Sequence, residues 1–412
     1  MRTAVFPETE LKSVDVLKTD GAFNAGCYVQ DGKLVPGLNR ALNPQAIFND
    51  ITVAFYAAAT KNYIYCSSDG MVCFTLTDSS LFQGKRVAAT RHSMLEMNEG
   101  GTPNAFVVGN STYIKINGMT NQVRPYKGAV RSCVLKNGRI FGVDNSDPFK
   151  IKWSGEGGIE DWTEGISGAG WVVLQNGGGE ILNLIVYKDK IVAVREYGLS
   201  FLTAYGTPEN FKLAYFDKRL PKICKNTVAV AGDKLYFYTE DGLYYYDGNK
   251  AEKSDTPLAA ELKDPTAVFS GNGKYYLCGE SKTLKRRAVL AVDTALNVDY
   301  IIDVGAEALC AGEKIFVYAD GKEYALDDGG EYAFTSGEID FSADGKKVLT
   351  EVVIDSENDV RVEVSNGVIS RIVGGVRGKF RPNMRGESFK ITVYGSGKIS
   401  KICAVAEVRS GV

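Results

Sequence analysis

The sequence predicts an all-β protein, a β-propeller followed by a small C-terminal β-sandwich. Three observations favour this fold: a hairpin that is apolar on both faces, a unit of strands and turns that recurs about every 42 residues, and a change of pattern near residue 334. The composition agrees, because 45 glycines and 22 tyrosines among 412 residues suit many short strands joined by tight turns.

The hairpin lies in residues 231–247 and is the clearest local signal. Two aromatic-rich strands flank Asp241-Gly242, a pair that suits a tight turn because glycine tolerates a positive φ. Leu235 and Phe237 point to one face of the first strand, and the tyrosines between and after them point to the other. A strand that is apolar on both faces must lie between other sheets, and a ring of small antiparallel sheets provides that environment.

A unit of short apolar strands separated by polar turns recurs along residues 53–326. The second strands of its copies centre near residues 64, 106, 141, 192, 236, 276 and 316. Their mean spacing of about 42 residues falls in the range of propeller blades. The repeat predicts seven blades, with six or eight as alternatives, in a propeller of residues 1–334 whose N-terminal segment pairs late in the ring. The one short helix that we expect is at residues 257–262.

Residues 335–412 show a different pattern. About six strands lie there, and some alternate apolar and polar residues, as in Val-Arg-Val-Glu-Val at residues 360–364. Such alternation implies one buried face in each strand. The pattern predicts a small C-terminal β-sandwich with its boundary near residue 334.

Charge and hydropathy disfavour some classes of protein. The formal net charge is −2, so the overall charge does not favour wrapping nucleic acid. No apolar run approaches the roughly 20 residues needed to cross a bilayer, and residues 1–12 lack a signal-peptide core. We therefore expect a soluble protein made in a cytoplasm, without membrane contact. The eight cysteines show no C-x-x-C spacing, which predicts buried, reduced thiols.

We predict no catalytic residue, no cofactor and no metal site. The single histidine, His92, has no Gly-x-Ser-x-Gly elbow beside it, so we expect a loop or strand-edge residue. The acidic runs at residues 144–147 and 355–359 lack the glycine and distal glutamate of an EF-hand loop. Glycine-rich runs within residues 155–179 lack the Lys-Ser/Thr ending of a phosphate-binding loop. We interpret these stretches as solvated turns and one long loop.

An aromatic stretch is the first candidate for a partner surface. It runs from Trp153 through Trp162 to Trp171, which are the three tryptophans of the chain. Exposed aromatic residues often dominate the energetics of protein–protein contacts. The stretch therefore predicts a contact surface.

A basic run is the second candidate. Residues 371–390 carry six lysines or arginines against one glutamate, and the residues that we select are Arg377, Arg381 and Arg385. Such a run suits an acidic partner or local nucleic acid contact. It equally suits a solvated strand edge on which cations discourage aggregation.

One span resembles a known group of proteins. It includes Lys150-Ile-Lys-Trp-Ser154, then Ile159-Glu-Asp-Trp162, then the hydrophobic unit of residues 179–202 with its Tyr-Gly turn. These motifs look like those of propeller-type structural proteins of tailed bacteriophages, including head-to-tail connector, packaged-DNA stabilisation and tail accessory proteins. The tail of residues 380–402 is similar to terminal sandwich modules on phage proteins.

The resemblance implies a non-enzymatic assembly protein of a phage or prophage particle. Its location would be the virion, and its partners would be other virion proteins, with a homo-oligomer as a further option. Two alternatives stay open. A carbohydrate-binding or glycan-cleaving propeller would need acids about 5–10 Å apart near the channel, and the candidates are Glu196, Asp217, Glu240 and Asp293. A bacterial protein-interaction scaffold is the third hypothesis.

Overall fold

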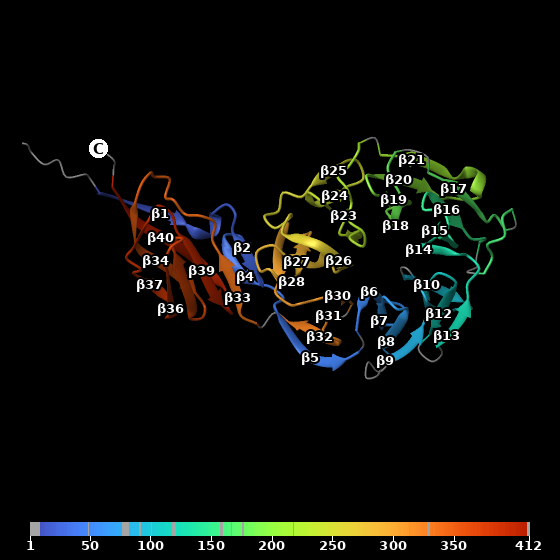
Figure 1. The fold of residues 1–412 in the computed structure, drawn as a ribbon, viewed down its shortest axis with the longest axis horizontal. Helices are drawn as coiled ribbons and strands as arrows, with labels where there is room; N and C mark the ends of the chain where they lie inside the picture. The colour runs from blue at the N-terminus through green and yellow to red at the C-terminus, as the bar shows by residue number, and fades with distance from the viewer. Residues whose placement is uncertain are drawn as a thin grey trace, which may run out of the picture.

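The structure is a computed structural model, and it shows a ring of small sheets joined to a second group of strands (Figure 1). The second group is built from both ends of the chain. The structure describes residues 9–47, 49–75, 82–89, 92–99, 101–117, 121–156, 160–165, 167–174, 177–216, 218–312, 314–327 and 330–409.

Six of the sheets formed by these described residues have four antiparallel strands each, and they are blades of a β-propeller. Five of the six follow one another along the chain. The first two contain β6 (Ile51–Ala57), β7 (Asn62–Ser67), β8 (Met71–Thr75), β9 (Phe82–Arg86), β10 (Ser93–Glu99), β11 (Thr102–Val108), β12 (Thr112–Ile116) and β13 (Asn121–Pro125). The next three contain β14 (Val130–Lys136), β15 (Arg139–Asp144), β16 (Lys150–Trp153), β17 (Gly170–Val173), β18 (Ile181–Tyr187), β19 (Lys190–Arg195), β20 (Gly198–Thr203), β21 (Lys212–Tyr215), β22 (Ala229–Ala231), β23 (Lys234–Thr239), β24 (Gly242–Tyr246) and β25 (Ala251–Lys253).

The sixth four-stranded sheet combines strands from distant parts of the chain. Its order is β30-β31-β32-β5, so an N-terminal strand forms its outer edge. The strands are β30 (Ala308–Ala311), β31 (Ile315–Ala319), β32 (Lys322–Asp327) and β5 (Arg40–Ala46). β5 therefore pairs at the end of the ring, where we expected the N-terminal segment to pair.

A nine-stranded sheet connects the ring to the second group of strands. It begins with four antiparallel strands in chain order, namely β26 (Leu262–Gly271), β27 (Lys274–Ser281), β28 (Arg287–Asp293) and β29 (Val298–Ile302). It continues through β2 (Phe23–Ala25), β33 (Tyr332–Thr335), β39 (Lys390–Gly395), β35 (Val360–Ser365) and β36 (Ser370–Val376). The connection is made by β2, which pairs with β29 on one side and with β33 on the other.

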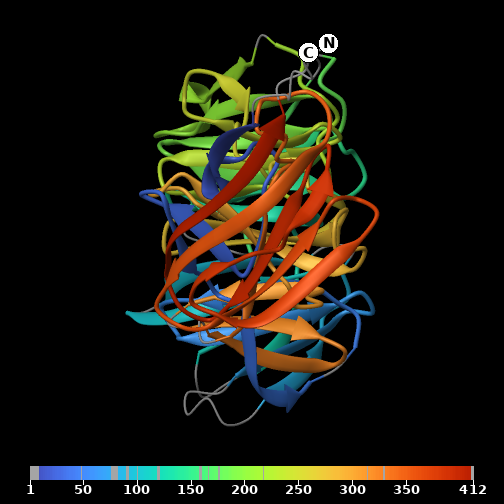
Figure 2. The ribbon, with the colours of Figure 1, turned by 90° about the vertical axis from the view of Figure 1, so that its left-hand side faces the viewer.

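A seven-stranded sheet packs against the outer part of the nine-stranded one. It contains β1 (Thr9–Asp15), β3 (Cys27–Gln30), β4 (Lys33–Pro36), β34 (Lys347–Ser356), β37 (Gly378–Phe380), β38 (Met384–Gly386) and β40 (Ile399–Arg409). Residues of both sheets share one hydrophobic core, for example Leu349 and Ala404 with Val362 and Ile391. In Figure 2 the C-terminal strands of the two sheets, in orange and red, lie in front of the ring.

The N-terminal residues are divided between the two parts of the molecule. β1 and β4 pair with β40, and β3 pairs with β4, whereas β5 pairs with β32. Residues 9–36 therefore belong by pairing to the C-terminal sheets, which differs from the expectation of one propeller unit in residues 1–334. The sequence gives no local signal for the pairing of β1 and β4 with β40, because both strands are short and lie more than 300 residues from that partner.

The hairpin of β23 and β24 has the two-faced burial that the sequence predicts. Leu235 and Phe237 pack with Val192 of the preceding blade. Tyr236 packs with Tyr275 of β27 on the opposite side, at 5.5 Å between ring centroids. The hairpin is thus held between two neighbouring sheets, and the reason for expecting a ring is confirmed.

The positions predicted for second strands are also correct. They fall in β7, β11, β15, β19, β23, β27 and β31, each of which lies between the first and third strands of its run. The sequence did not reveal the outermost strand of these runs. Strands such as β21 and β25 are only four and three residues long and contain no buried residue, so they lack the long apolar signal of the inner strands.

Two local expectations are wrong. Residues 257–260 form turns instead of a helix, and Leu262 already belongs to β26; the backbone N–H groups of Ala259 and Glu261 donate to the carbonyl oxygens three residues earlier, as in successive turns. In the central hairpin, Thr239 pairs with Gly242, so Gly242 ends the turn at a φ of 116° and does not form its middle. The helices among the described residues are two single 3-10 turns, η1 (Val16–Lys18) and η2 (Pro208–Asn210).

The cysteines are free and at least partly buried, as the sequence predicts. All eight cysteines are free; six are buried, and Cys224 and Cys403 are half-buried. Burial raises the pKa of Cys133 to about 12, so its thiol stays protonated at neutral pH. In the described ranges we find no helix that is both long enough and apolar enough to cross a membrane.

Candidate interaction surface

Trp153, the first residue of the predicted aromatic surface, belongs to the core. Its side chain on β16 is buried, and its ring centroid lies 5.2 Å from that of Phe211 in the next blade. The indole Nε1 donates a hydrogen bond to the carbonyl oxygen of Gly168, at 3.0 Å. Trp153 therefore cannot contact a partner, and the prediction for this residue is wrong. Its role is to fix the segment between β16 and β17.

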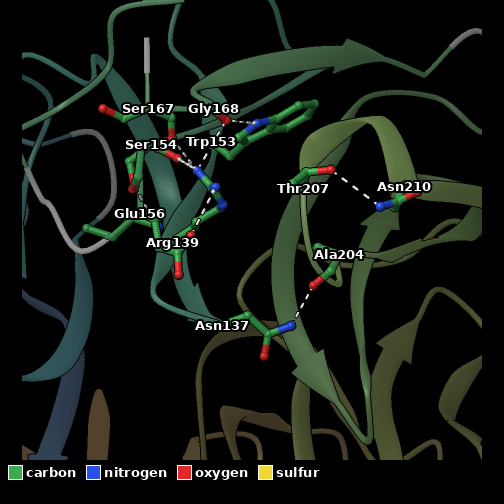
Figure 3. Close-up of polar contacts among 12 residues, drawn as sticks. Asn137, Arg139, Trp153, Ser154, Glu156, Ser167, Gly168, Ala204, Thr207 and Asn210 are labelled. Carbon is green, nitrogen blue, oxygen red and sulfur yellow. Dashed lines mark hydrogen bonds and ion pairs between the residues drawn. The ribbon is translucent and has the colours of Figure 1, made fainter. Parts of the chain in front are cut away.

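A buried arginine fixes the same segment (Figure 3). Arg139 on β15 is 5% exposed, and its Nη1 donates to the carbonyl oxygens of Ser154, Ser167 and Gly168 at 3.1, 2.9 and 3.2 Å. Its Nη2 lies 3.5 Å from the Glu156 carboxylate. A cation is stable in the interior only where its donors are satisfied. We infer that this guanidinium and these carbonyl groups stabilise one conformation of the segment.

The next blade is tied to this one through the β14–β15 turn. Asn137 and Gly138 form the turn with φ angles of 48° and 71°, which is the left-handed pair that Asn-Gly favours. The Asn137 amide then donates to the carbonyl oxygen of Ala204, at 2.6 Å, just after β20 (Figure 3). The following residue, Tyr205, is 79% exposed. A local turn signal thus places an exposed aromatic residue at the junction of two blades.

Trp171 is exposed, as the sequence predicts. It lies on β17, the outer strand of its blade, and is 46% exposed. Its indole Nε1 donates to the Glu164 carboxylate at 3.0 Å, and Lys150 Nζ lies 4.4 Å from the ring centroid. Tyr215, on the outer strand of the following blade, is also exposed. We call Trp171, Tyr205 and Tyr215 the rim surface.

Trp162 packs between blades. It is half-buried, and its ring meets that of Tyr126 edge-on at 5.6 Å between centroids. Tyr126 follows β13, so this contact joins the outer part of one blade to the segment that precedes β17. Trp162 therefore packs at the junction of two blades and is only partly exposed.

The predicted basic residues lie in the other part of the molecule. Arg377, Arg381 and Arg385 are exposed, in and around β37 and β38 of the seven-stranded sheet. Figure 1 places β37 at the left of the molecule and β17 at the right of the ring. The structure does not bring the arginines to the tryptophans, so the two candidates are separate surfaces.

The single histidine lies at the wall of the central channel. His92 immediately precedes β10, and it lines a cavity of about 340 Å³ between the innermost strands of the ring. It is buried, and its Nε2 donates to the carbonyl oxygen of Val87 at 2.8 Å. Burial lowers the pKa of His92 below its ordinary value, so the ring is neutral at physiological pH. The strand-edge position agrees with the sequence, and its hydrogen bond gives the ring a structural role.

The acidic residues that we considered for carbohydrate chemistry stabilise loops and turns. Glu196 and Glu240 each accept a hydrogen bond from the backbone N–H of a neighbouring loop, and Asp293 accepts one from the backbone N–H of Ala295 in its own turn. Asp217 lies outside the described residues. Across the described ranges, no three His, Cys, Asp or Glu side chains are grouped closely enough to hold a metal ion.

Sequence reasoning missed three residues that shape the rim surface. Arg139 follows an Asn-Gly turn inside an apolar strand, and a cation in that position was an available signal for a buried anchor. Tyr205 and Tyr215 carried no signal, because exposed and buried tyrosines occur in similar local sequences of this tyrosine-rich chain.

The comparisons with known proteins identify no relative. No protein-family model matches the sequence, and no curated protein matches it. Among solved structures, the β-propeller domain of Myceliophteria thermophila Cps50 (Swd1) is 11% identical, with a TM-score of 0.49 over 70% of this chain and 99% of that one. PorZ, an essential bacterial surface component of the type-IX secretion system of Porphyromonas gingivalis, is 9% identical, with a TM-score of 0.44. That match covers 80% of this chain and 46% of PorZ. Both likenesses are too weak to carry an argument about function.

Proposed function

We propose that the chain is a non-catalytic β-propeller scaffold that binds a partner protein through the rim surface. The observation that carries this function is the exposed Trp171 beside a segment that Arg139 and Trp153 hold in place. An aromatic anchor on a fixed backbone loses little conformational entropy on binding, which is typical of an interface hot spot. Tyr205 and Tyr215 extend the contact area across two blades.

We also propose a finer description of the fold, with seven blades and a C-terminal sandwich. Strands β26–β29 would be the seventh blade, because they are four antiparallel neighbours in chain order. Their residues pack on both sides, with Leu290 toward β23 and Ala291 toward β30. The two sheets that share the core of Leu349 and Val362 would be the sandwich, completed by residues 9–36.

Assembly into a phage or prophage particle is the narrower form of the scaffold function, and its support is the sequence resemblance of residues 150–202 and 380–402. We expect mass spectrometry of purified, induced particles from the producing strain to detect this chain. Particles that lack the chain would contradict the virion location, and the rim surface would then serve a partner in the host cell.

We expect Trp171→Ala to weaken partner binding about 30-fold, since truncating a hot-spot aromatic residue costs about 2 kcal/mol or more. A photo-crosslinking amino acid at Tyr205, introduced in cells that produce the chain, identifies the partner. Titration of the purified partner against the parent chain and the variant then measures the affinity.

The matched control is Val123→Ala, because Val123 is an exposed apolar residue on β13, the outer strand of another blade. Val123→Ala should leave the affinity unchanged. Equal losses in the two variants, or no loss in either, would remove the rim surface as the binding site.

A further inference from the structure

We propose that β36 is a docking edge for an extended, acidic and apolar segment of a partner protein, which would add to the nine-stranded sheet as a further strand. β36 is the last strand of that sheet and pairs only with β35 among the described strands. The edge lies in the C-terminal group of strands and is independent of the rim surface.

The exposed side chains of this edge are unusually apolar. Ile372 on β36 is 60% exposed, and Val373 beside it is exposed as well. The loop that leads into the strand presents Val368, 88% exposed, and Ile369. Sheet edges that stay unpaired usually carry charges or proline in place of such side chains, because an apolar edge invites pairing. Four neighbouring apolar side chains in water indicate a surface that another polypeptide covers.

The core ends one strand before this edge. In the antiparallel register, Val362 of β35 lies opposite Val373 of β36, and residues that are paired in this way share a face. Val362 is fully buried in the core between the two sheets, whereas Val373 is exposed. β36 therefore extends past the opposite sheet, and both of its faces can contact an added strand.

The face of β36 is open at its two glycines. A Cβ atom built on Gly374 or Gly375 would meet no atom within 4 Å. The register shifts between Val360 and Val362 at this point, so the glycines form a bulge that limits regular pairing to Ser370–Val373 and the preceding loop. Glycine within a strand permits the close approach of a second backbone.

Two hydrogen bonds fix the edge against the strands of the other sheet. The Arg371 guanidinium donates to the carbonyl oxygen of Pro382. The Asn366 amide donates to the carbonyl oxygen of Arg385 at 2.7 Å. These contacts place β36 and its loop next to the segment that carries Arg381. The apolar side chains and the basic run found in the sequence thus form one surface.

The positive charge of this surface indicates which kind of partner it binds. Residues 366–390 carry six cations and a single carboxylate, Glu387. All six cations are exposed, and Lys379 pairs with Glu351 of β34 at 3.0 Å. A second copy of the chain would bring two such basic surfaces together, which like-charge repulsion opposes. A strand with alternating acidic and apolar residues would instead match both the charge and the exposed side chains.

The test uses the full chain and a fluorescent peptide of roughly ten residues in which valine and glutamate alternate. A matched peptide carries lysine in place of glutamate. By fluorescence anisotropy, we expect the glutamate peptide to bind at least about tenfold more tightly, with an affinity that falls as salt is added. Hydrogen exchange should slow within residues 370–376 when this peptide binds.

Two variants separate the apolar and electrostatic contributions. Ile372→Glu should weaken binding of the glutamate peptide about tenfold or more, and the double variant Arg377→Glu/Arg381→Glu should remove most of the salt dependence. Both changes are at exposed sites, so thermal unfolding should match that of the parent chain. Leu11→Glu is the control, because Leu11 is an exposed apolar residue on β1, another edge strand.

Several results would overturn the docking edge. Equal binding of the two peptides, or full binding by Ile372→Glu, would show that β36 is not the site. Sedimentation of the parent chain as a dimer that Ile372→Glu dissociates would make a second copy the occupant. Tighter binding to anionic phospholipid vesicles or to duplex DNA than to the glutamate peptide would make a lipid surface or nucleic acid the ligand.

Discussion

The Arg139→Met protein is expected to be about 3 kcal/mol less stable than the parent chain. Three carbonyl oxygens accept hydrogen bonds from one guanidinium: that of Ser154 in a buried contact, and those of Ser167 and Gly168 in half-buried contacts. Methionine fills a similar volume but donates no hydrogen bond, and each buried carbonyl without a donor costs about 1–3 kcal/mol. Because water reaches part of this segment, we expect the total loss of stability to lie near the lower end of the range summed over the three carbonyl groups. Urea unfolding, followed by tryptophan fluorescence, measures the difference.

The control for this change is Arg286→Met. Arg286 forms an ion pair with Asp303 at an exposed site, where such pairs contribute less than about 1 kcal/mol. Hydrogen exchange within residues 154–170 adds a local measurement, since exchange should accelerate there in Arg139→Met alone. A variant with full stability and unchanged exchange would show that the carbonyl groups find other donors.

The same variant connects the fold to the proposed function. The Arg139 side chain is buried and cannot touch a partner, so it acts as a positioning residue for the segment that precedes Trp171. Arg139→Met should therefore weaken binding at the rim surface and leave peptide binding at β36 unchanged. The two surfaces belong to different sheets, and this variant distinguishes them.

The ring could be predicted because its inner strands have a strong local signature. Leu235 and Phe237 alternate with tyrosines, and all of them are buried between neighbouring sheets. Only a strand with sheets on both sides buries both of its faces, so a single hairpin carries information about its surroundings. The recurrence of that signature about every 42 residues located the second strand of each run.

The remaining features depend on contacts that local sequence does not encode. β5 closes a sheet with β32, and β1 pairs with β40, across almost the whole length of the chain. Outer strands such as β17 and β21 contain no buried residue because one of their edges faces water, so their sequences lack a burial pattern. Trp153 and Trp171 occur in similar apolar segments, yet one is buried beneath Phe211 and the other is exposed on an outer strand. Which tryptophan is exposed is decided by the neighbouring blade.

Glu323 couples the closure of the ring to pH. It lies on β32, 5% exposed, opposite Gln45 of β5 in the register. The titratable groups that face it are Tyr65 of β7, Cys73 of β8 and Cys310 of β30, and burial raises the pKa of each of these three, so they are neutral near pH 7. Burial likewise raises the pKa of Glu323 to about 7, against a smaller opposing effect of the Tyr65 hydroxyl.

We therefore expect the protein to lose stability as the pH rises from about 4.5 to about 7. In this window the unfolded chain releases the Glu323 proton while the folded chain retains it. The folded state then binds more protons, so the free energy of unfolding falls with pH, by about 3 kcal/mol over the window. Glu323→Gln cannot ionise, and its stability should change by about 3 kcal/mol less between about pH 5 and about pH 8 in urea unfolding.

Glu10→Gln, at an exposed position of β1, should keep the pH dependence of the parent chain. Identical pH dependence in Glu323→Gln and the parent chain would show that this carboxyl is already ionised in the folded ring.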